Sequence, residues 1–326
     1  MRQKKQSMKV RIKTALRRNR FLNRIYGDYL YRKSKRLYEK DPCMAADAIY
    51  YKTFKRHIDW EHPKELNEKI QWLLRNTDTK LWTKCADKYR VRKYVEEKGC
   101  SDILVKLYGQ WDNPNDIDFS KLPDKFVLKA NNGCGTVKVI TDKKSLNESK
   151  LKKELKHWIS RPFGYGGAQS HYLSIERCII AEELLEETGL QKELSPTSLI
   201  DYKIWCINGN PQCILVIFGR ANKQYFRQVY DLQWNKMPEV MNMKSNGHFT
   251  FKEVDIPKPD CLNEMLDIAC KLSEPFPEVR VDLYVIGGKP YFGELTFTAG
   301  MGSFTDEYYR KLGDMIVLPE KKINKG

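Results

Sequence analysis

Four residues near the C-terminus could bind a divalent cation and phosphate: Arg280, Asp282, Glu294 and Thr296. Two adjacent glycines lie between the two pairs and indicate a hairpin. Side chains alternate along a strand, so Arg280 shares a face with Asp282, and Glu294 shares one with Thr296. A three-residue turn over 287–289 would place the two carboxylates opposite each other, whereas a four-residue turn without a bulge would put them on opposite faces.

Opposed carboxylates on a partly buried sheet repel each other unless a cation lies between them. Mg²⁺ prefers oxygen ligands and is commonly held by one or two carboxylates together with nucleotide phosphates, so Asp282 and Glu294 are candidate ligands. Arg280 would then balance phosphate charge. We therefore expect amide substitution of either acid to leave the thermal stability of the ligand-free protein unchanged or higher. The alternative is an ordinary Arg–Asp–Glu ladder on the surface of a sheet.

A glycine-rich segment, 131–135, reads Asn-Asn-Gly-Cys-Gly and lies between two strand-like stretches. In P-loop and dinucleotide-binding proteins the glycines open a helix, so neither motif applies to the tip of a hairpin. The backbone N–H groups of such a tip can still close over phosphates, and Lys129, directly before it, could reach them as a point charge. A glycine turn beside a surface lysine is the alternative.

Three further stretches are candidates for the same site. Segment 179–185 should be a buried strand that ends in two glutamates and two leucines, which could offer a backbone edge and an apolar wall to an adenine. Lys203, within Asp-Tyr-Lys-Ile-Trp, would lie beside it. Arg220, followed by two more basic residues, would suit an anionic acceptor such as a uronic acid or an amino-acid carboxylate, or else belongs to a solvated basic face.

The elements around these candidates change in kind along the chain. Residues 8–31 have apolar residues at roughly helical spacing among many lysines and arginines, which predicts one or two basic amphipathic helices. A helical pattern also covers 63–99, and 112–123, rich in Asn, Asp and Pro, indicates a linker. Beyond it, helices are expected at about 146–159 and 260–273. The expected strands are 126–130, 136–140, 178–185, 199–207, 212–219, 279–286 and 291–297.

The composition narrows the class of protein. With 326 residues and 41% apolar content, the chain can form two or three packed subdomains. Its nine cysteines have no paired spacing and its five histidines are scattered, which indicates reduced thiols and no structural zinc site. There is no run of 18 apolar residues and no apolar signal-peptide core, so we expect a cytoplasmic protein.

The formal charge of +16 is concentrated at the N-terminus. Residues 1–40 contain 15 Lys and Arg and two acids, whereas the rest of the chain has 43 basic and 40 acidic residues. A nearly neutral body speaks against a nucleic-acid-binding module, so no nucleic-acid partner is expected. The basic arm could dock on the body as an interface helix, or adsorb peripherally to an anionic membrane at its inner face.

In their order along the chain, these motifs resemble the ATP-grasp superfamily, and more closely its teichuronopeptide-biosynthesis branch, which occurs with bacterial surface-polysaccharide genes. The resemblance covers about residues 50–316. It rests on six segments: Asp87-Lys88-Tyr89, residues 126–133, residues 180–185, Asp201-Tyr202-Lys203, Arg280-Val281-Asp282 and residues 294–297.

The resemblance implies an α+β protein in which two α+β subdomains with antiparallel sheets clasp ATP, preceded by a helical N-terminal lobe and the basic arm. The implied division is a basic helical arm over 1–45, an N-terminal lobe over 46–123, a lid subdomain with the glycine-rich hairpin over 124–186, a C-terminal subdomain with the Mg²⁺ site over 187–318, and a tail over 319–326.

The resemblance also implies roles for individual residues. ATP would be bound by Lys129, Asn131, Gly133, Gly135, Thr136, Glu182, Glu183, Leu185 and Lys203. The metal ligands would be Asp282, Glu294 and Thr296, the catalytic residues Arg280 and Lys203, and the substrate-binding residue Arg220. Thr296 departs from the wider superfamily, where an Asn commonly supplies a further metal contact, although a hydroxyl can still ligate Mg²⁺.

The implied reaction is ATP- and Mg²⁺-dependent amide formation. An acceptor carboxylate attacks the γ-phosphate, and an amine then attacks the acyl-phosphate, with catalysis by positioning and charge neutralisation. The acceptor would be a small molecule or a glycan-linked carboxylate, such as a precursor of a surface polysaccharide. Two alternatives remain: a sugar or phosphate kinase using the same nucleotide site, and a glycosyltransferase of the same pathway, whose DxD-type metal motif is not evident.

Overall fold

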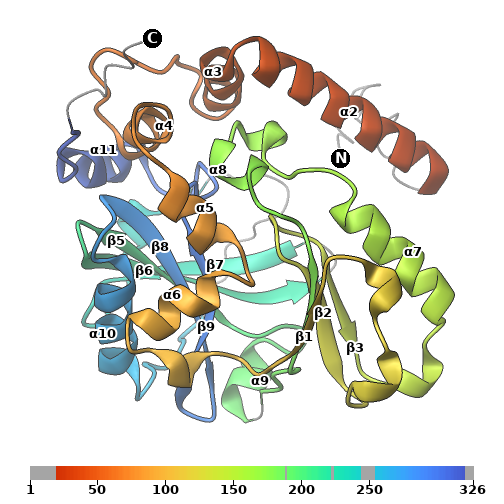
Figure 1. Ribbon diagram of the computed structural model, residues 1–326. Coiled ribbons are helices and arrows are strands. Elements are labelled where there is room, and N and C mark those ends of the chain that lie inside the picture. Colours follow the sequence, from red (N-terminus) through yellow and green to blue (C-terminus); the bar gives the residue numbers. More distant parts are fainter. Residues whose placement is uncertain (1–19, 188, 222–223, 244–253, 320–326) are drawn as a thin grey trace, which may run out of the picture.

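Two antiparallel sheets, each flanked by helices, are built by the residues that the computed structural model describes: 20–187, 189–221, 224–243 and 254–319 (Figure 1). The first half of the expected basic arm and most of the expected tail lie outside these residues. Among the helices within them, none combines the length and the apolar composition needed to cross a bilayer.

The smaller sheet has four strands, and α7 (Glu148–Ile159) packs its buried Leu151 and Leu155 into the same core. Asn147 caps this helix by accepting the backbone N–H of Lys150. In spatial order its strands are β1 (Leu107–Trp111), β4 (Ile179–Glu182), β2 (Phe126–Ala130) and β3 (Val137–Ile140). We call this sheet and α7 the lid.

The segment 112–123 is not a linker. Asn113 and Asp118 accept backbone N–H groups two residues ahead of them, and each opens a short 3₁₀ turn, η2 (Pro114–Asp116) and η3 (Phe119–Lys121). These turns put three apolar side chains into the core of the lid: Ile117, Phe119 and Leu122. The Asn, Asp and Pro residues therefore provide turns within a packed segment.

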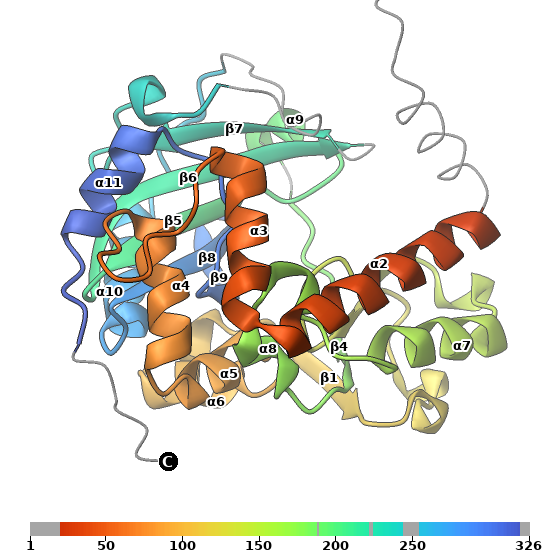
Figure 2. The same ribbon diagram turned by 90° about the horizontal axis from the view of Figure 1, so that it is seen from above.

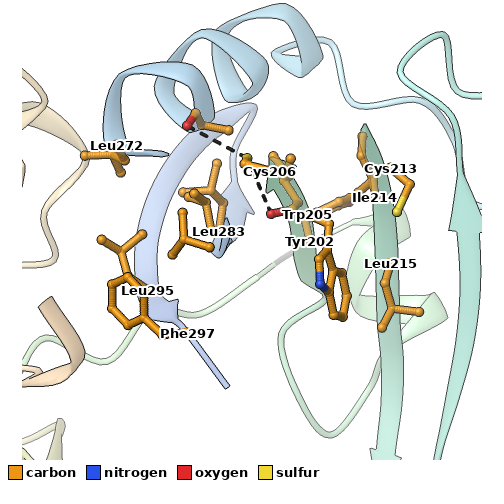
Figure 3. Close-up of a cluster of buried hydrophobic side chains, with 14 of the residues drawn as sticks. Tyr202, Trp205, Cys206, Cys213, Ile214, Leu215, Leu272, Leu283, Leu295 and Phe297 are labelled. Atoms are coloured by element: carbon orange, nitrogen blue, oxygen red, sulfur yellow. Dashed lines mark hydrogen bonds between the residues drawn. The ribbon is translucent and has the colours of Figure 1, made fainter. Parts of the chain in front are cut away.

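The larger sheet has five strands, and α10 (Leu262–Ser273) covers one of its faces. In spatial order its strands are β7 (Gln224–Tyr230), β6 (Asn210–Ala221), β5 (Asp201–Ile207), β8 (Glu278–Ile286) and β9 (Lys289–Thr296). Figure 3 shows the side chains of Leu272, Leu283 and Leu295 among those that fill the core between sheet and helix. This core is a separate cluster from that of the lid.

The expected N-terminal lobe, 46–123, is largely helical over 66–97, whereas its residues 107–111 form β1 of the lid. A capping box opens its first helix, because Glu65 accepts the backbone N–H of Glu68 and the Glu68 carboxylate accepts that of Glu65. The helices of the lobe are α4 (Leu66–Asn76), α5 (Lys80–Ala86) and α6 (Val91–Glu97). The other helices are α8 (Ser170–Leu173), α9 (Leu190–Leu194) and α11 (Asp306–Asp314).

The described part of the basic arm, 20–45, contains α2 (Arg20–Lys40) and the start of α3 (Pro42–Phe54), which continues into the expected N-terminal lobe; Asp41 separates the two helices. Asp41 caps α3 by accepting the backbone N–H of Met44. Figure 2 shows α2 continuing beyond α3 along the side of the molecule that carries α7. The C-terminal half of α2 is docked on the body, which is the interface-helix interpretation of this part of the arm.

Candidate active site

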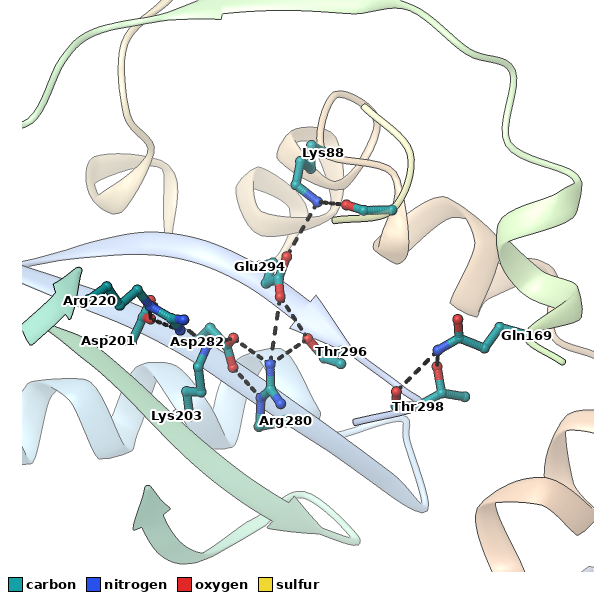
Figure 4. Close-up of polar contacts among 11 residues, drawn as sticks. Lys88, Gln169, Asp201, Lys203, Arg220, Arg280, Asp282, Glu294, Thr296 and Thr298 are labelled. Atoms are coloured by element: carbon teal, nitrogen blue, oxygen red, sulfur yellow. Dashed lines mark hydrogen bonds and ion pairs between the residues drawn. The ribbon is translucent and has the colours of Figure 1, made fainter. Parts of the chain in front are cut away.

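Charged side chains of alternating sign form a row along one face of the larger sheet (Figure 4). In spatial order the row consists of Lys88, Glu294, Arg280, Asp282, Lys203, Asp201 and Arg220. We call it the charged row. Four cations and three carboxylates therefore alternate, which leaves the row with one excess positive charge.

Strand register brings the members of the charged row together. Lys203 on β5 is paired with Asp282 on β8, and Asp282 is paired with Glu294 on β9. Two residues away on the same face of β8, Arg280 lies between Trp205 and Thr296. Directly paired residues on one face are close enough to interact. The four residues from which the sequence prediction started thus share one face of the sheet, as expected.

The hairpin between β8 and β9 reaches this register by a different route from the one expected. Its turn has two residues, Gly287 and Gly288, both with positive φ, and not three. A two-residue turn alone would pair Asp282 with Gly293. Instead the ladder shifts by one residue between Asp282 and Leu283, so that Gly293 is an extra residue and Asp282 is paired with Glu294. The two acids are opposed, as a three-residue turn would have placed them, but the turn has neither of the two lengths considered from the sequence.

Gly293 has little room for a side chain. A Cβ atom built on it would lie 2.9 Å from the backbone oxygen of Asp282. The bulge therefore depends on close approach of two backbones at the position where the two carboxylates are aligned.

Arg280 provides the cation between the two acids in the ligand-free chain. Its Nε and Nη2 atoms lie 2.6 and 2.7 Å from the Asp282 carboxylate, and Nη2 lies 3.6 Å from Glu294 Oε1. Nη2 also donates to the Thr296 hydroxyl at 3.1 Å, and the guanidinium lies over the Trp205 ring. The repulsion expected between unshielded acids is therefore already relieved, and Lys203 is also paired with Asp282.

Both kinds of charge in the row are stabilised by their neighbours. Burial alone would raise the pKa of Glu294, but Lys88, Lys203 and Arg280 together lower that pKa to about 2. Burial alone would lower the pKa of Arg280, but Asp282 raises it above its usual value. The carboxylate and the guanidinium consequently both stay ionised at neutral pH.

Lys88, like Asp201, is a member of the row to which the sequence prediction assigned no role. It follows α5, and its Nζ donates to the Gly133 carbonyl at 2.6 Å and lies 3.3 Å from Glu294 Oε2. It thus joins the N-terminal lobe, the glycine-rich loop and the larger sheet. In the sequence, the clue to Lys88 was its position next to Asp87. In the structure Asp87 is buried and accepts the backbone N–H groups of Tyr89 and Arg90, which caps the turn that follows.

The glycine-rich loop is held by its own side chains as well. Asn131 is buried, donates to the Glu176 carbonyl and accepts the Cys178 N–H, so its amide anchors the base of the loop. Gly133 has a φ of 74°, and a Cβ atom there would lie 2.3 Å from the Phe163 ring. The remaining predicted loop residues, Gly135 and Thr136, follow at the tip before β3 begins.

The predicted lysine of the lid pairs with a predicted glutamate. Lys129 on β2 lies 2.6 Å from Glu182 on β4, and Arg92 of α6 approaches the other carboxylate oxygen at 3.4 Å. The buried strand ends at Glu182, three residues earlier than expected. Residues 183–187 therefore leave the sheet as the connection toward α9.

A cavity of about 400 Å³ lies between the two sheets and this connection. Val127, Lys129 and Val139 come from the lid, and Tyr284 and Phe292 from the larger sheet. The connection contributes five residues: Glu183, Leu184, Leu185, Glu186 and Glu187. The walls of the cavity thus combine apolar side chains with a few charged groups.

A smaller cavity leads from this space toward the charged row. It shares Val105, Lys129 and Phe292 with the larger one, and it is also lined by Lys88 and Gly293. The predicted site residues therefore lie around the two cavities: Glu183 and Leu185 at the large cavity, Lys129 between the two, and Asp282, Glu294, Thr296, Arg280 and Lys203 in and beside the charged row. Arg220 is at the end of the row opposite Lys88, where its backbone is hydrogen-bonded to Thr197 and Ser198 of the large cavity's wall.

The oxygen atoms of the charged row have the chemistry that Mg²⁺ prefers. Asp282 and Glu294 are opposed, and the Thr296 hydroxyl donates to Glu294 at 3.1 Å. In the described part of the chain, no three side chains of the His, Cys, Asp and Glu types gather around one point. A cation here would thus rely on two carboxylates, a hydroxyl and oxygens of its ligand, a donor set that fits Mg²⁺.

The chain was compared with known proteins. It matches the model of the TupA-like ATPgrasp family over residues 68–317. No curated protein is similar enough to count as a match.

Three solved structures show distant likeness. D-alanine–D-alanine ligase from Bacillus anthracis, complexed with ATP, is 16% identical, with 78% of this chain and 68% of that chain covered and a TM-score of 0.45. The L-amino acid ligase from Bacillus licheniformis is 15% identical, with 81% of this chain and 57% of that chain covered and a TM-score of 0.43. The ADP complex of N5-carboxyaminoimidazole ribonucleotide synthetase is 12% identical, with 72% of this chain and 51% of that chain covered and a TM-score of 0.42.

All three TM-scores are below 0.5, so we draw no residue roles or substrates from these structures. The family match is different in kind, because it extends over about three quarters of the chain and includes the whole charged row, both cavities and the glycine-rich loop. The chain therefore belongs to the TupA-like ATP-grasp family, whose α+β fold it has, and it is an ATP-grasp ligase.

Proposed function

We propose that this ligase uses ATP and Mg²⁺ to join a carboxylate to an amine through an acyl-phosphate. The observation that carries the proposal is the charged row at one end of a partly apolar cavity between two sheets. Pockets of a few hundred Å³ with apolar walls and a few convergent polar groups are typical of nucleotide-sized ligands.

The adenine would occupy the 400 Å³ cavity, against Leu185, Tyr284 and Phe292. Its phosphates would extend past Lys129 toward the charged row, beneath the glycine-rich loop. Lys129 and Lys88 line the smaller cavity on this path. Cations there would neutralise phosphate charge in a site that is shielded from water, where such interactions are strongest.

Asp282, Glu294 and Thr296 would hold the metal ion, which supplies charge neutralisation at the phosphates when it is bound. Arg280 and Lys203 now pair with Asp282. With Asp282 bound to a metal ion, these two cations would become available to phosphate oxygens. Ligand binding would then exchange ion-pair partners within the row, and Arg280 and Lys203 would stabilise charge on the transferred phosphoryl group.

The acceptor carboxylate would bind near Arg220, at the far end of the row. Arg220 lies 2.7 Å from Asp201, and its side chain is 44% exposed, so an incoming anion can reach it. One carboxylate oxygen would attack the γ-phosphorus, with ADP as leaving group. The amine would then attack the acyl carbon, lose a proton and expel inorganic phosphate. A glycan-linked carboxylate of a surface polysaccharide is the acceptor class that the teichuronopeptide-like sequence motifs support.

The test is a screen of uronic acids and amino acids with ATP and Mg²⁺, using carboxylates labelled with ¹⁸O. We expect inorganic phosphate that carries one ¹⁸O atom from the acceptor, together with an amide found by mass spectrometry. An Arg220→Gln variant should raise KM for the acceptor more than KM for ATP, and Lys98→Gln, whose ion pair with Glu274 lies outside the row, is the control. A phosphate ester without ¹⁸O-labelled phosphate would show a kinase instead.

A further inference from the structure

Helix α2 has two faces with different surroundings, and one of them is attached to the body. Tyr31 and Tyr38 pack edge-on against Tyr165, with ring centroids 5.7 and 5.5 Å apart. Asp28 forms a 2.8 Å ion pair with Arg161, whose guanidinium also lies over the Tyr31 ring. These contacts fix one face of the helix to the loop before α8.

The opposite face of α2 is exposed and apolar in its first half. Leu22, Ile25 and Tyr29 are 40%, 51% and 59% exposed. At about 100° per residue they fall within one narrow stripe, roughly on the far side of the helix from Tyr31 and Tyr38. Single exposed apolar residues are ordinary, but three in one stripe on a helix that projects from the body form a surface.

The same stripe becomes basic in its second half. Arg32, Lys33, Arg36 and Lys40 are exposed and lie on or beside the continuation of the apolar stripe. Ahead of α2, residues 1–19 add eight basic residues and no acid to the sequence. The outward face therefore combines apolar side chains with a high density of positive charge.

This combination selects among the partners that an exposed face can have. A second copy of the chain would bring the same cations against these cations, which is unfavourable. A nucleic acid would match the charge but leave Ile25 and Tyr29 without an apolar partner. An anionic bilayer satisfies both halves, because an amphipathic helix at its surface buries apolar side chains among the acyl chains while lysines and arginines contact the headgroups.

We propose that the outward face of α2 binds the surface of an anionic lipid bilayer. The inference does not rest on the proposed function. Because the inward face is held by Tyr165 and Arg161, the helix can adsorb without leaving the body, so the whole ligase would be carried to the membrane surface.

The test is sedimentation of the full chain at low salt with two kinds of vesicle, phosphatidylcholine alone and phosphatidylcholine mixed with phosphatidylserine. We expect binding to the second kind only. Loss of three charges in Arg32→Gln/Lys33→Gln/Arg36→Gln should weaken partitioning by on the order of a hundred-fold, since each surface cation contributes about five-fold. The apolar variant Ile25→Gln/Tyr29→Gln should also weaken it, and this loss should persist at high salt.

The matched control is Lys258→Gln/Lys271→Gln/Lys311→Gln, which removes the same charge from exposed positions outside α2. It should sediment as the wild type does, and circular dichroism should show that all variants are folded. Equal loss in the control, or unchanged sedimentation of both α2 variants, overturns the proposal. Tighter binding to a DNA duplex than to the anionic vesicles, lost in the α2 variants, would overturn it in favour of nucleic acid.

Discussion

Arg280 determines how the two opposed acids affect the stability of the ligand-free protein. From the sequence alone the pair looks like an unrelieved repulsion that awaits a metal ion. In the structure Asp282 accepts two hydrogen bonds from Arg280 and is also paired with Lys203, all of them largely buried. Removing one charge from such a group leaves its cations without a partner, and this costs more than the repulsion it relieves.

We therefore expect Asp282→Asn to destabilise the ligand-free chain by about 3 kcal/mol, the usual cost of breaking a buried ion pair. Urea unfolding without nucleotide measures this free energy. The control Asp255→Asn removes an exposed carboxylate paired with Lys236, and it should change the free energy of unfolding by less than about 1 kcal/mol. An Asp282→Asn protein as stable as the wild type would instead restore the expectation drawn from the sequence.

Single residues were predictable where side-chain type and strand alternation sufficed, and not where a rotamer decided the contact. Asp282, Glu294 and Arg280 were found because alternate positions on a strand share a face. That Arg280 lies between the two acids depends on the direction of its side chain, which no spacing rule gives. Lys88 was missed as a site residue because it reaches the charged row from a different part of the fold.

At the level of elements, the β8–β9 hairpin shows how one residue sets the chemistry of a face. A two-residue turn and a one-residue bulge together give the same register as the three-residue turn considered from the sequence. Alternation predicts which residues share a face only when the bulge is known, and a bulge has no strong sequence signal beyond a glycine.

Replacement of Gly293 by alanine should disturb this register without abolishing the fold. The added Cβ would lie 2.9 Å from the Asp282 carbonyl, so one strand must shift. We expect a loss of about 1–3 kcal/mol in stability, typical of overpacking, and a smaller rise in melting temperature on addition of ATP and Mg²⁺.

The control for this variant is Gly166→Ala, because a Cβ there meets no atom within 4 Å. Thermal unfolding with and without nucleotide measures both effects. If the two alanine variants respond alike to nucleotide, the backbone approach at Gly293 has no role in aligning the acids.

Many strands and helices of the body were predicted to within a few residues, whereas β1, the packed segment after it, β7 and the short helices α8, α9 and α11 were not. All five residues of β1 are half-buried, so they show neither clear alternation nor an apolar run. This strand forms because it pairs with β4, which is distant in the sequence, so no local pattern predicts it. Segment 112–123 has the composition of a loop, and its three buried side chains are decided by tertiary packing.

At the scale of the whole molecule, three parts surround the candidate site. The lid, the larger sheet and the N-terminal lobe meet at Lys88, which contacts Gly133 of the glycine-rich loop and Glu294 of β9 (Figure 4). A second contact, between Arg92 of the lobe and Glu182 of the lid, lies close by. The lobe thus connects the two sheets that enclose the 400 Å³ cavity.

We expect Lys88→Met to loosen the glycine-rich loop in the ligand-free chain, because the Gly133 carbonyl loses a charge-assisted hydrogen bond. Hydrogen exchange should show about a ten-fold or greater loss of protection in residues 131–137, a change of the size that one such bond accounts for, with the core strand β2 unchanged.

Lys84→Met is the control, since Lys84 is paired with Glu97 on the lobe surface away from the loop. It should leave exchange of the loop as it is in the wild type. Equal exchange of the loop in all three proteins would mean that Lys88 does not restrain it.

Because the two sheets have separate cores, the cleft formed by the cavity between them can open without disrupting either core. Each sheet keeps its own buried apolar cluster, so the cleft can widen without bringing either core into contact with water. The hydrophobic free energy that stabilises the fold then contributes little to the work of opening. Resistance comes instead from ion pairs such as those of Lys88 and Arg92, which are largely buried and therefore only weakly screened by dissolved salt. We therefore expect the width of the cleft to respond to the charge of an incoming ligand more than to ionic strength, and largely independently of the melting temperature.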